Sequence, residues 1–415
     1  MQEKGLMRHG AFAAIWLANA VSVLGDWLHA MALTVLVYEL TGSGLAVGLM
    51  LVSKVLPALF MGAVAGVIVD RWSRKWLMVA SDVARFLMVL CFLLVRTPAA
   101  VVLVVILNLL LSAASSVFRP ARSAALAGLV PRGQLVTANA WLEGTSNIVM
   151  LVGTLTGGVL TGAIGPYNVF LINAGSFLIS AAALLFVPGR LAGAPPGVSG
   201  QKKTGLWRDF VEGLQRLAQE RVPFFLILFY SLWILGVGMA NVVMIVFARD
   251  VWGAGAASVS YLYSAVGAGA IVGALCARPV SERLRPVPLL IGGIAFVGLV
   301  DIWFGLARTL ATGCALLFLA GIWDGLMTVA NDSTIMKQVP QRFVGRVFSV
   351  YGALTTACNV FGMLLSGLVS DLFGARMVMV SAGVYMVLLA AGSLVTGPCL
   401  LAASTPVGSL TRRSP

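Results

Sequence analysis

Two long apolar runs joined by a short basic turn constrain the fold of this chain more than any other feature. Residues 45–69 and 77–95 carry few charges. Each run is long enough to cross a bilayer, because roughly 20 apolar residues span about 30 Å of hydrocarbon. The turn between them, residues 70–76, reads Asp-Arg-Trp-Ser-Arg-Lys-Trp and is too charged to lie in lipid. The two runs therefore predict a membrane hairpin with its basic turn in the cytoplasm.

The composition of the chain agrees with a protein embedded in lipid. Of its 415 residues, 60% are hydrophobic and 10% are charged, whereas soluble proteins carry about 25% charged residues. The mean hydropathy is +0.98. These features predict an all-α integral membrane protein with twelve transmembrane helices. The expected spans are approximately 12–38, 45–69, 77–95, 99–118, 136–161, 167–187, 223–248, 257–277, 287–307, 310–330, 346–369 and 377–398.

Lysines and arginines are distributed unevenly among the segments that join these spans. The chain carries 28 basic and 15 acidic residues. If both termini are cytoplasmic, nearly all basic residues outside the spans face the cytoplasm, and the exceptions are Arg96, Arg249, Arg308 and Arg376. This asymmetry follows the positive-inside rule and sets the orientation of the chain, with both termini in the cytoplasm. The expected location is a bacterial-type inner membrane, which the chain crosses many times. It excludes nucleic acid as a partner, since no basic face is contiguous outside these loops.

The chain divides near its middle into two halves. Residues 1–188 are expected to form an N-terminal six-helix bundle, and residues 223–400 a C-terminal one. Residues 189–222 combine Gly, Pro and Ser with a charged stretch and are interpreted as a cytoplasmic linker. Residues 401–415 are interpreted as a disordered tail.

The turn between the second and third spans carries a motif. Its residues Gly66, Asp70, Arg71, Arg74 and Lys75 fit the pattern Gly-x-x-x-Asp-Arg-x-x-Arg-Arg/Lys. In this the chain resembles the major facilitator superfamily of secondary transporters. Three further segments resemble its drug- and siderophore-exporter branch, which includes macrolide and enterobactin exporters. These segments are Leu24–Trp27, Tyr38–Ser43 and Phe118–Arg122.

The resemblance implies a fold and an energy source. The fold would be two pseudo-symmetric six-helix bundles with a substrate site near the middle of the bilayer between them. The turn motif recurs half a chain later as Gly273, Ala277 and Arg278, which agrees with a duplicated six-helix unit. Alanine replaces the acid there, so any gating role should be stronger in the first half. The resemblance implies a monomer driven by a proton gradient, with no cofactor.

The resemblance also gives the turn a mechanical role. In the superfamily, the acid of the motif contacts the eleventh helix and the basic residues tie neighbouring helices, which latches the cytoplasmic side closed. Asp70 is thus expected near residues 345–348, where a helix N-terminus attracts negative charge. Gly66, Arg71, Arg74 and Lys75 would complete this cytoplasmic gate latch.

Asp26 is the leading candidate for a functional charge inside a span. A charge at the membrane centre costs roughly 2.5–3.5 kcal/mol on insertion scales, so it needs a partner or a water-filled cavity. Asn19, Asp26 and His29 lie on one stripe of the first helix, and Lys54 of the second lies at a comparable depth. Two interpretations are open. Asp26 binds protons or substrate while Lys54 tunes it, or the two form a structural ion pair.

Glu143 and Asn147 form a second polar stripe, on the fifth helix. Glu143 either relays protons or pairs with Arg119 or Arg122 of the preceding loop, and the pairing is the preferred interpretation.

Asp324 in the tenth span is a secondary candidate for proton or substrate binding, although a cap or loop contact is the preferred role. Its stripe includes Thr328 and Asn331, with Asp332 in the following loop. Asp301 is expected at the surface, near the outer end of its span.

Asp82 and Arg85 of the third helix are expected to neutralise each other as i, i+3 partners. On the seventh span, Tyr230, Trp233 and Asn241 are candidates to line the central cavity. Aromatic side chains there would suit an amphipathic ligand, but at helical spacing they also serve as packing residues.

Several classes of function are excluded by missing motifs. The sequence has no Gly-x-x-x-x-Gly-Lys-Ser/Thr loop, so ATP does not drive the protein directly. Its two histidines and five cysteines show no metal-binding spacing. The chain is therefore not expected to be an enzyme or to hold a metal.

These observations lead to one expected function and two alternatives. The chain is expected to be a secondary active transporter that exports a small amphipathic molecule, such as a drug, macrolide or siderophore, in exchange for protons. A flippase for lysophospholipid or another lipid could use the same fold. A non-transporting membrane sensor or assembly protein is the other alternative, but it would have no need to keep costly charges such as Asp26 and Lys54 in the membrane.

Overall fold

A computed structural model describes residues 10–131, 134–187, 214–215, 217, 220–340 and 343–401. Within its helices, the side chains of residues 58–60, 62–67, 70–71, 136, 278, 281–282 and 395–401 are not described. Most of the expected linker and nearly all of the expected tail lie outside these residues.

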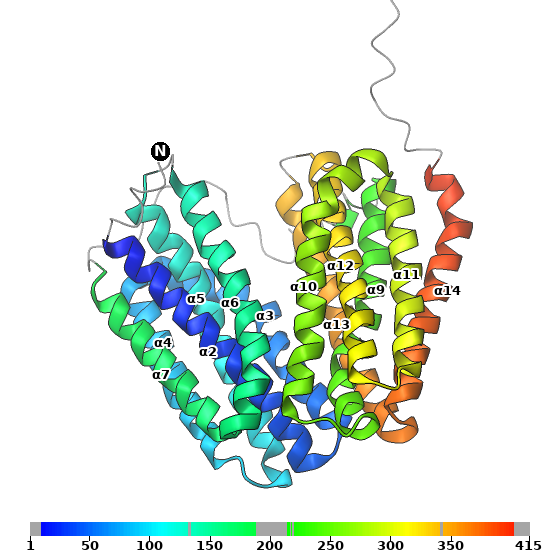
Figure 1. The fold of residues 1–415 in the computed structure, drawn as a ribbon. Helices are drawn as coiled ribbons and strands as arrows, with labels where there is room; N and C mark the ends of the chain where they lie inside the picture. The colour runs from blue at the N-terminus through cyan, green and yellow to red at the C-terminus, as the bar shows by residue number, and fades with distance from the viewer. Residues whose placement is uncertain are drawn as a thin grey trace, which may run out of the picture. The chain divides into compact units, whose positions relative to one another are not determined.

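The described part of the chain consists of helices and the short segments that connect them (Figure 1). The first group comprises α2 (Gly10–Thr41), α3 (Gly44–Arg71), α4 (Arg74–Cys91), α5 (Val101–Leu129), α6 (Leu135–Ile164) and α7 (Pro166–Leu185). The second comprises α9 (Arg221–Val246), α10 (Ala256–Arg283), α11 (Pro286–Leu306), α12 (Leu310–Gln338), α13 (Val344–Phe373) and α14 (Ala375–Leu401). Short helical turns lie at Phe92–Leu94, Pro98–Ala100 and Phe247–Val251.

These helices confirm the expected all-α membrane fold. Among the described residues, 11 helices are long and apolar enough to cross a membrane, and α3 contributes the shorter apolar segment Gly44–Pro57. The limits agree with the expected spans at most ends.

Two helices continue well beyond their expected ends. Helix α5 runs to Leu129, so Arg119 and Arg122 lie on a helix and not in a loop. Helix α12 runs to Gln338, so Asp332 is also helical. The expected ends were wrong because falling hydropathy marks where the apolar stretch stops, whereas a helix continues as long as its backbone hydrogen bonds do.

The first helices pack around α2. Helix α2 lies against α6 and α7, while α4 lies against α5 and α7, and α3 against α5. Glycines allow the close approach of α6 to α2. A Cβ atom at Gly153 would lie 2.9 Å from the Cβ atom of Trp27, and one at Gly157 would lie 3.0 Å from that of Met31. Small residues at this spacing let membrane helices approach closely.

The second group of helices has an aromatic and aliphatic core. Trp233, Phe225 and Ile294 are almost fully buried in it, together with Met327 of α12 and Met386 of α14. This core surrounds the middle of α9 and positions the polar side chains that α9, α12 and α13 carry.

The chain separates into two compact units whose limits do not follow the sequence halves. Unit 1 comprises Met1–Lys203, Asn241–Ser264 and Met363–Ala375. Unit 2 comprises Thr204–Ala240, Ala265–Gly362 and Arg376–Pro415. The end of α9, the start of α10 and the end of α13 therefore belong to the unit that contains α2 to α7.

Candidate functional site

A cavity of about 330 Å³ lies among α2, α3 and α5 within unit 1. Its size is at the lower end for pockets that bind small molecules, which hold about 300–1,000 Å³. Apolar atoms form most of its wall, although many of the side chains that line it also carry a polar group. The polar residues that line it are Asp26, His29, Lys54, Asn108, Ser112, Ser115, Ser116 and Arg119.

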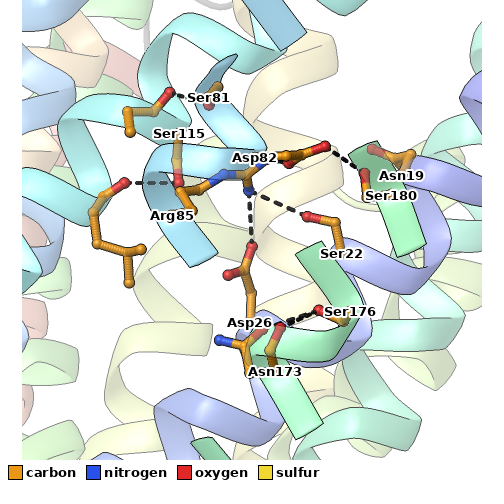
Figure 2. A network of polar contacts seen from close by, with 12 residues as sticks. Asn19, Ser22, Asp26, Ser81, Asp82, Arg85, Ser115, Asn173, Ser176 and Ser180 are labelled. Carbon is orange, nitrogen blue, oxygen red and sulfur yellow. Dashed lines mark hydrogen bonds and ion pairs between the residues drawn. The ribbon is translucent and has the colours of Figure 1, made fainter. Parts of the chain in front are cut away.

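Asp26 is the acidic residue of this wall, and its partner is Arg85. The Oδ2 atom of Asp26 lies 3.7 Å from a terminal nitrogen of Arg85, which α4 contributes. The Asp26 side chain is 34% exposed and that of Arg85 only 3%. Figure 2 shows the guanidinium group between the two carboxylates of Asp26 and Asp82. Asp26 thus meets the cavity on one side and a buried cation on the other.

Arg85 is held by more contacts than Asp26 is. Its guanidinium group donates to Asp82 and, over 3.2 Å, to the hydroxyl of Ser22. The ring centroids of Phe118 and Phe177 lie 4.7 and 4.5 Å from its central carbon. Cation–π contacts and a carboxylate partner together offset the cost of burying this charge.

Asp82 completes the anchoring of Arg85. It is fully buried and accepts a 2.6 Å hydrogen bond from the Ser180 hydroxyl of α7. Asp82 thus holds Arg85 in place, which leaves the longer contact to Asp26 free to change.

Lys54 faces the same cavity but is not the ion-pair partner of Asp26. Its ammonium group lies 5.0 Å from the centroid of the Trp27 ring. Among the described residues, the ion pair of Asp26 is with Arg85. Sequence reasoning missed this role of Arg85 because the i, i+3 spacing to Asp82 already supplied a partner. The sequence did contain one signal of this role, because Arg85 is a charged residue inside an otherwise apolar span.

His29 and Asn19 do not join the Asp26–Arg85 group. His29 packs between Phe92 and Phe170, with ring centroids 4.8 and 4.7 Å away. Neither of its ring nitrogens has a hydrogen-bond partner within the described part of the chain. Asn19 donates to the Ser146 hydroxyl over 2.9 Å and accepts from Arg122.

Glu143 pairs with Arg122, as the sequence interpretation preferred. Their atoms are 2.8 Å apart, and the Glu143 side chain is 56% exposed. Asn147 of the same helix is exposed. The polar stripe of α2 is therefore divided: Asn19 belongs with Arg122 and Glu143, whereas Asp26 belongs with Arg85.

Two residues of the turn motif tie the start of α4 to its neighbours. Arg74 donates to the carbonyl of Ala124 over 2.8 Å. The buried ammonium of Lys75 donates to the carbonyls of Leu185 and Val187 over 2.7 and 2.6 Å. Leu185 is the last residue of α7, and the C-terminal end of a helix favours a positive charge. The side chains of Gly66, Asp70 and Arg71 lie outside those that the structure describes, so the latch stays a prediction.

In unit 2 the candidates of α9 and α12 come together. The hydroxyl of Tyr230 lies 2.8 Å from that of Thr328, which also binds Asp324. The Tyr230 ring contacts the ring of Trp233 at 5.1 Å between centroids. Asn241 lies further along α9, in unit 1, where its carbonyl accepts from Tyr263 over 2.7 Å.

Asp301 is not at the surface, contrary to the sequence interpretation. Only 3% of this α11 residue is exposed. Its position near the helix end suggested exposure, but neighbouring helices cover it.

Sequence reasoning also missed a group of contacts within unit 1, around the C-terminal end of α2 and the N-terminal start of α3. Glu39 pairs with Arg249, and the Tyr38 hydroxyl donates to Asp250 over 2.7 Å. Asp371, at the end of α13, accepts from the backbone nitrogen of Gly44 over 2.6 Å. Its charge therefore lies at the N-terminus of α3, where the helix dipole favours an anion.

A family model described as a transmembrane secretion effector matches residues 5–403. The chain belongs to this family. The MFS-type transporter YfiS of Bacillus subtilis (strain 168) is 29% identical over 400 residues, which cover 93% of this chain and 92% of that protein. The enterobactin exporter EntS of Escherichia coli O6:K15:H31 is 28% identical over 388 residues, covering 91% and 88%. The chain is therefore a transporter of the major facilitator superfamily and not an enzyme.

Solved structures show the same fold. A bacterial homologue of the human lysosomal transporter Spinster gives a TM-score of 0.75 at 14% identity, over 94% of this chain and 97% of that one. The nucleoside transporter NupG gives 0.72 at 16% identity, over 93% and 98%. These likenesses confirm the expected all-α fold of this superfamily. The described residues hold no group of three His, Cys, Asp or Glu side chains that could bind a metal ion.

Proposed function

We propose that this transporter exports a small amphipathic molecule in exchange for protons, by alternating access, and that Asp26 is the carboxylate that couples the two. The observation that carries the proposal is the position of Asp26, between a cavity and a buried arginine. It works as a monomer in a bacterial inner membrane, with both termini in the cytoplasm.

The coupling follows from the charges around the cavity. While Asp26 is ionised, it pairs with Arg85, whose other carboxylate partner, Asp82, is fixed by Ser180. A proton on Asp26 removes its charge and weakens the 3.7 Å contact. The two protonation states therefore present different charges to a substrate in the cavity, which is the differential interaction that coupling requires.

The wall of the cavity supports an amphipathic substrate. Trp27, Leu33 and Leu111 offer apolar surface, and Ser112 and Lys54 offer polar contacts. The likeness to an enterobactin exporter supports export as the direction.

The test uses inside-out membrane vesicles with an acidic interior. Erythromycin, enterobactin and a lysophospholipid are added in turn, and loss of the proton gradient is recorded. We expect at least one compound to dissipate the gradient with the wild type and not with Asp26→Asn. Glu143→Gln is the matched control, because it removes an exposed acid of the same bundle that is already paired with Arg122.

Equal responses of the wild type and Asp26→Asn would exclude Asp26 as the coupling residue. If one of the compounds is taken up into the vesicles while none of them dissipates the proton gradient, the result would contradict proton coupling. A response to the lysophospholipid alone would favour the flippase alternative.

A further inference from the structure

We propose that the contact between Asp371 and the start of α3 is a latch that must open for transport. This outer latch consists of the hydrogen bonds that Asp371 accepts from Ser43, Gly44 and Leu45. All four residues lie in unit 1, at the opposite end of α3 from the turn motif of residues 70–75. With both termini in the cytoplasm, that end faces the outside. The inference rests on the proposed alternating access, because such a carrier opens outward in each cycle.

Asp371 occupies an unfavourable position within its own helix. Helix α13 ends at Phe373, so Asp371 lies in its last turn, and Gly374 with a φ of +82° follows the helix. The C-terminal end of a helix carries a partial negative charge, which disfavours an anion. The last turn of α13 contains no basic residue that could offset this charge. The carboxylate therefore needs a partner from another helix.

The start of α3 supplies that partner. The Ser43 hydroxyl donates to Oδ2 of Asp371 over 2.6 Å. The backbone nitrogen of Gly44 donates to Oδ1 over 2.6 Å, and that of Leu45 to Oδ2 over 3.3 Å. The first amide groups of a helix have no partner within the helix and attract negative charge. Asp371 therefore caps α3 with charge-assisted hydrogen bonds, which are stronger than bonds between neutral groups.

Glycines bring the two helices close together at this end. A Cβ atom at Gly367 would lie 2.6 Å from the Cα atom of Leu45, and one at Gly48 would lie 2.9 Å from the carbonyl oxygen of Met363. Both distances are too short for a side chain, and small residues allow such an approach between membrane helices. Gly367 precedes Asp371 by four residues and shares its face of α13. One face of α13 thus provides both the close packing and the cap.

The same glycine-to-acid spacing occurs at the other end of α3. Gly66 and Asp70 lie in its last turns, and Asp70 is expected at the start of α13. The side chain of Asp70 lies outside those that the structure describes, so that contact stays a prediction. Helix α3 has 28 residues, or a length of about 42 Å, so the two acids act on opposite sides of the membrane. Each of the two helices would then end in an acid that caps the start of the other.

The outer latch is also built so that it can open. Asp371 is exposed, whereas Gly44 is buried. Water can therefore replace the partners of the carboxylate as soon as α13 moves away, and no charge is left in an apolar environment. The amide groups of α3 would lose their cap at the same time, so the closed state is favoured until that loss is offset.

A second contact lies near the outer latch, between the ends of α2 and α9. Glu39 pairs with Arg249, and Tyr38 donates to Asp250. The ion pair is partly exposed, and exposed pairs contribute little. Glu39 is therefore a suitable reference for Asp371, because both are acids in contacts at the same end of unit 1.

The first experiment measures opening without any substrate. Val47 is fully buried and follows Gly44 by three residues on α3, so it shares the face of the latch. Val47→Cys is introduced into a chain whose five native cysteines are replaced by serine. Right-side-out membrane vesicles are treated with a membrane-impermeant maleimide, and the labelling rate is recorded. Asp371→Ala should raise this rate at least about fivefold, which corresponds to the loss of a helix cap of about 1 kcal/mol.

Matched variants separate the outer latch from general loosening. Asp371→Asn keeps a neutral acceptor and should raise the labelling rate less than Asp371→Ala does. Glu39→Gln should change the rate less than about twofold, as expected for an exposed pair. Val104→Cys reports on a fully buried position of α5 and should stay unlabelled in every variant. A wild-type rate in Asp371→Ala, or an equal rise in Glu39→Gln, would overturn the latch.

A disulfide across the outer latch gives an independent test. A Cβ atom at Gly44 would lie 3.2 Å from that of Ser370, near the separation of about 3.5–4.5 Å found in disulfides. Gly44→Cys/Ser370→Cys in the same cysteine-free chain should cross-link on mild oxidation. The cross-linked protein should lose nearly all probe-driven proton flux and regain it on reduction, while the oxidised single variant Gly44→Cys keeps its flux. Unchanged flux in the cross-linked protein would overturn the latch.

The two experiments also separate the outer latch from the proposed export function. Faster labelling in Asp371→Ala, together with vesicles that never lose their gradient, would support the latch and place the failure in proton-coupled export. Unchanged labelling, together with a probe that dissipates the gradient, would overturn the latch and leave export in place.

Discussion

Two polar groups inside the membrane-spanning helices differ in how their charge is balanced. In unit 1, Asp26 and Asp82 share Arg85, and Lys54 stands on the wall of the same cavity. In unit 2, Asp324 accepts from the Thr328 hydroxyl, which in turn lies 2.8 Å from the Tyr230 hydroxyl. A carboxylate paired with a cation weakens that pairing when it binds a proton, whereas a carboxylate bonded to hydroxyls has no charged partner to release. The two bundles of a duplicated fold thus provide different chemistry.

The largest expected effect comes from breaking the buried pair in unit 1. Arg85→Met leaves the fully buried Asp82 without its cation. Removal of one partner of a buried pair costs about 3–5 kcal/mol. Thermal unfolding in detergent should show a strong loss of stability, and the double variant Asp82→Asn/Arg85→Met should recover most of it. A single variant as stable as the wild type would mean that Asp82 does not depend on Arg85.

Asp324→Asn should separate stability from transport. No cation pairs with this carboxylate within the described residues, so its replacement leaves no charge unbalanced. The change in stability should stay below about 1 kcal/mol, while probe-driven proton flux falls because a candidate proton-binding carboxylate is lost. Thermal unfolding and flux are measured on one preparation. A destabilisation as large as that of Arg85→Met would show that the charge of Asp324 is balanced by a partner, as the charge of Asp82 is.

Lys54→Met tests how much the second cation of the cavity contributes. The variant loses the contact with the Trp27 ring, worth about 0.5–1 kcal/mol at an exposed site. We expect a small loss of stability and a change in which probes are exported, because a charge is removed from the cavity wall. If the variant binds charged and neutral probes with the affinity of the wild type, Lys54 does not contribute to substrate binding.

The smallest expected effect on stability comes from the contacts between the end of α2 and the start of α3. The ion pair between Glu39 and Arg249 is partly exposed, with side chains 45% and 25% accessible. Exposed pairs contribute about 0.2–1 kcal/mol, so Glu39→Gln should barely alter thermal unfolding. Asp371→Asn, which removes an anion from the start of α3, serves as the comparison variant. A large loss from Glu39→Gln would show that this pair carries more of the fold than its exposure indicates.

The spans of the chain could be predicted from the sequence because each one is encoded locally. Runs of about 20 apolar residues and the basic turns between them mark a membrane helix by themselves. The ends of α5 and α12 could not be placed in the same way, because polar residues continue both helices past the apolar stretch.

The partners within the candidate site could be predicted only in part. Asp26, Glu143 and Asp324 stood out as acids within apolar helices. The partner of Asp26 could not be read from spacing, since Arg85 reaches it from another helix. The contact between Tyr230 and Tyr351 likewise joins residues that are far apart in the chain. Spacing along one helix shows which residues share a face, but not which face of another helix they meet.

The most direct test of the account is the change of interior pH in inside-out vesicles when an exported probe is added, compared between the wild type and Asp26→Asn. The account predicts that the probe consumes the gradient in the wild type and leaves it intact in the variant, while Glu143→Gln behaves as the wild type does. A variant that still consumes the gradient at the wild-type rate would contradict the claim that Asp26 couples protons to export.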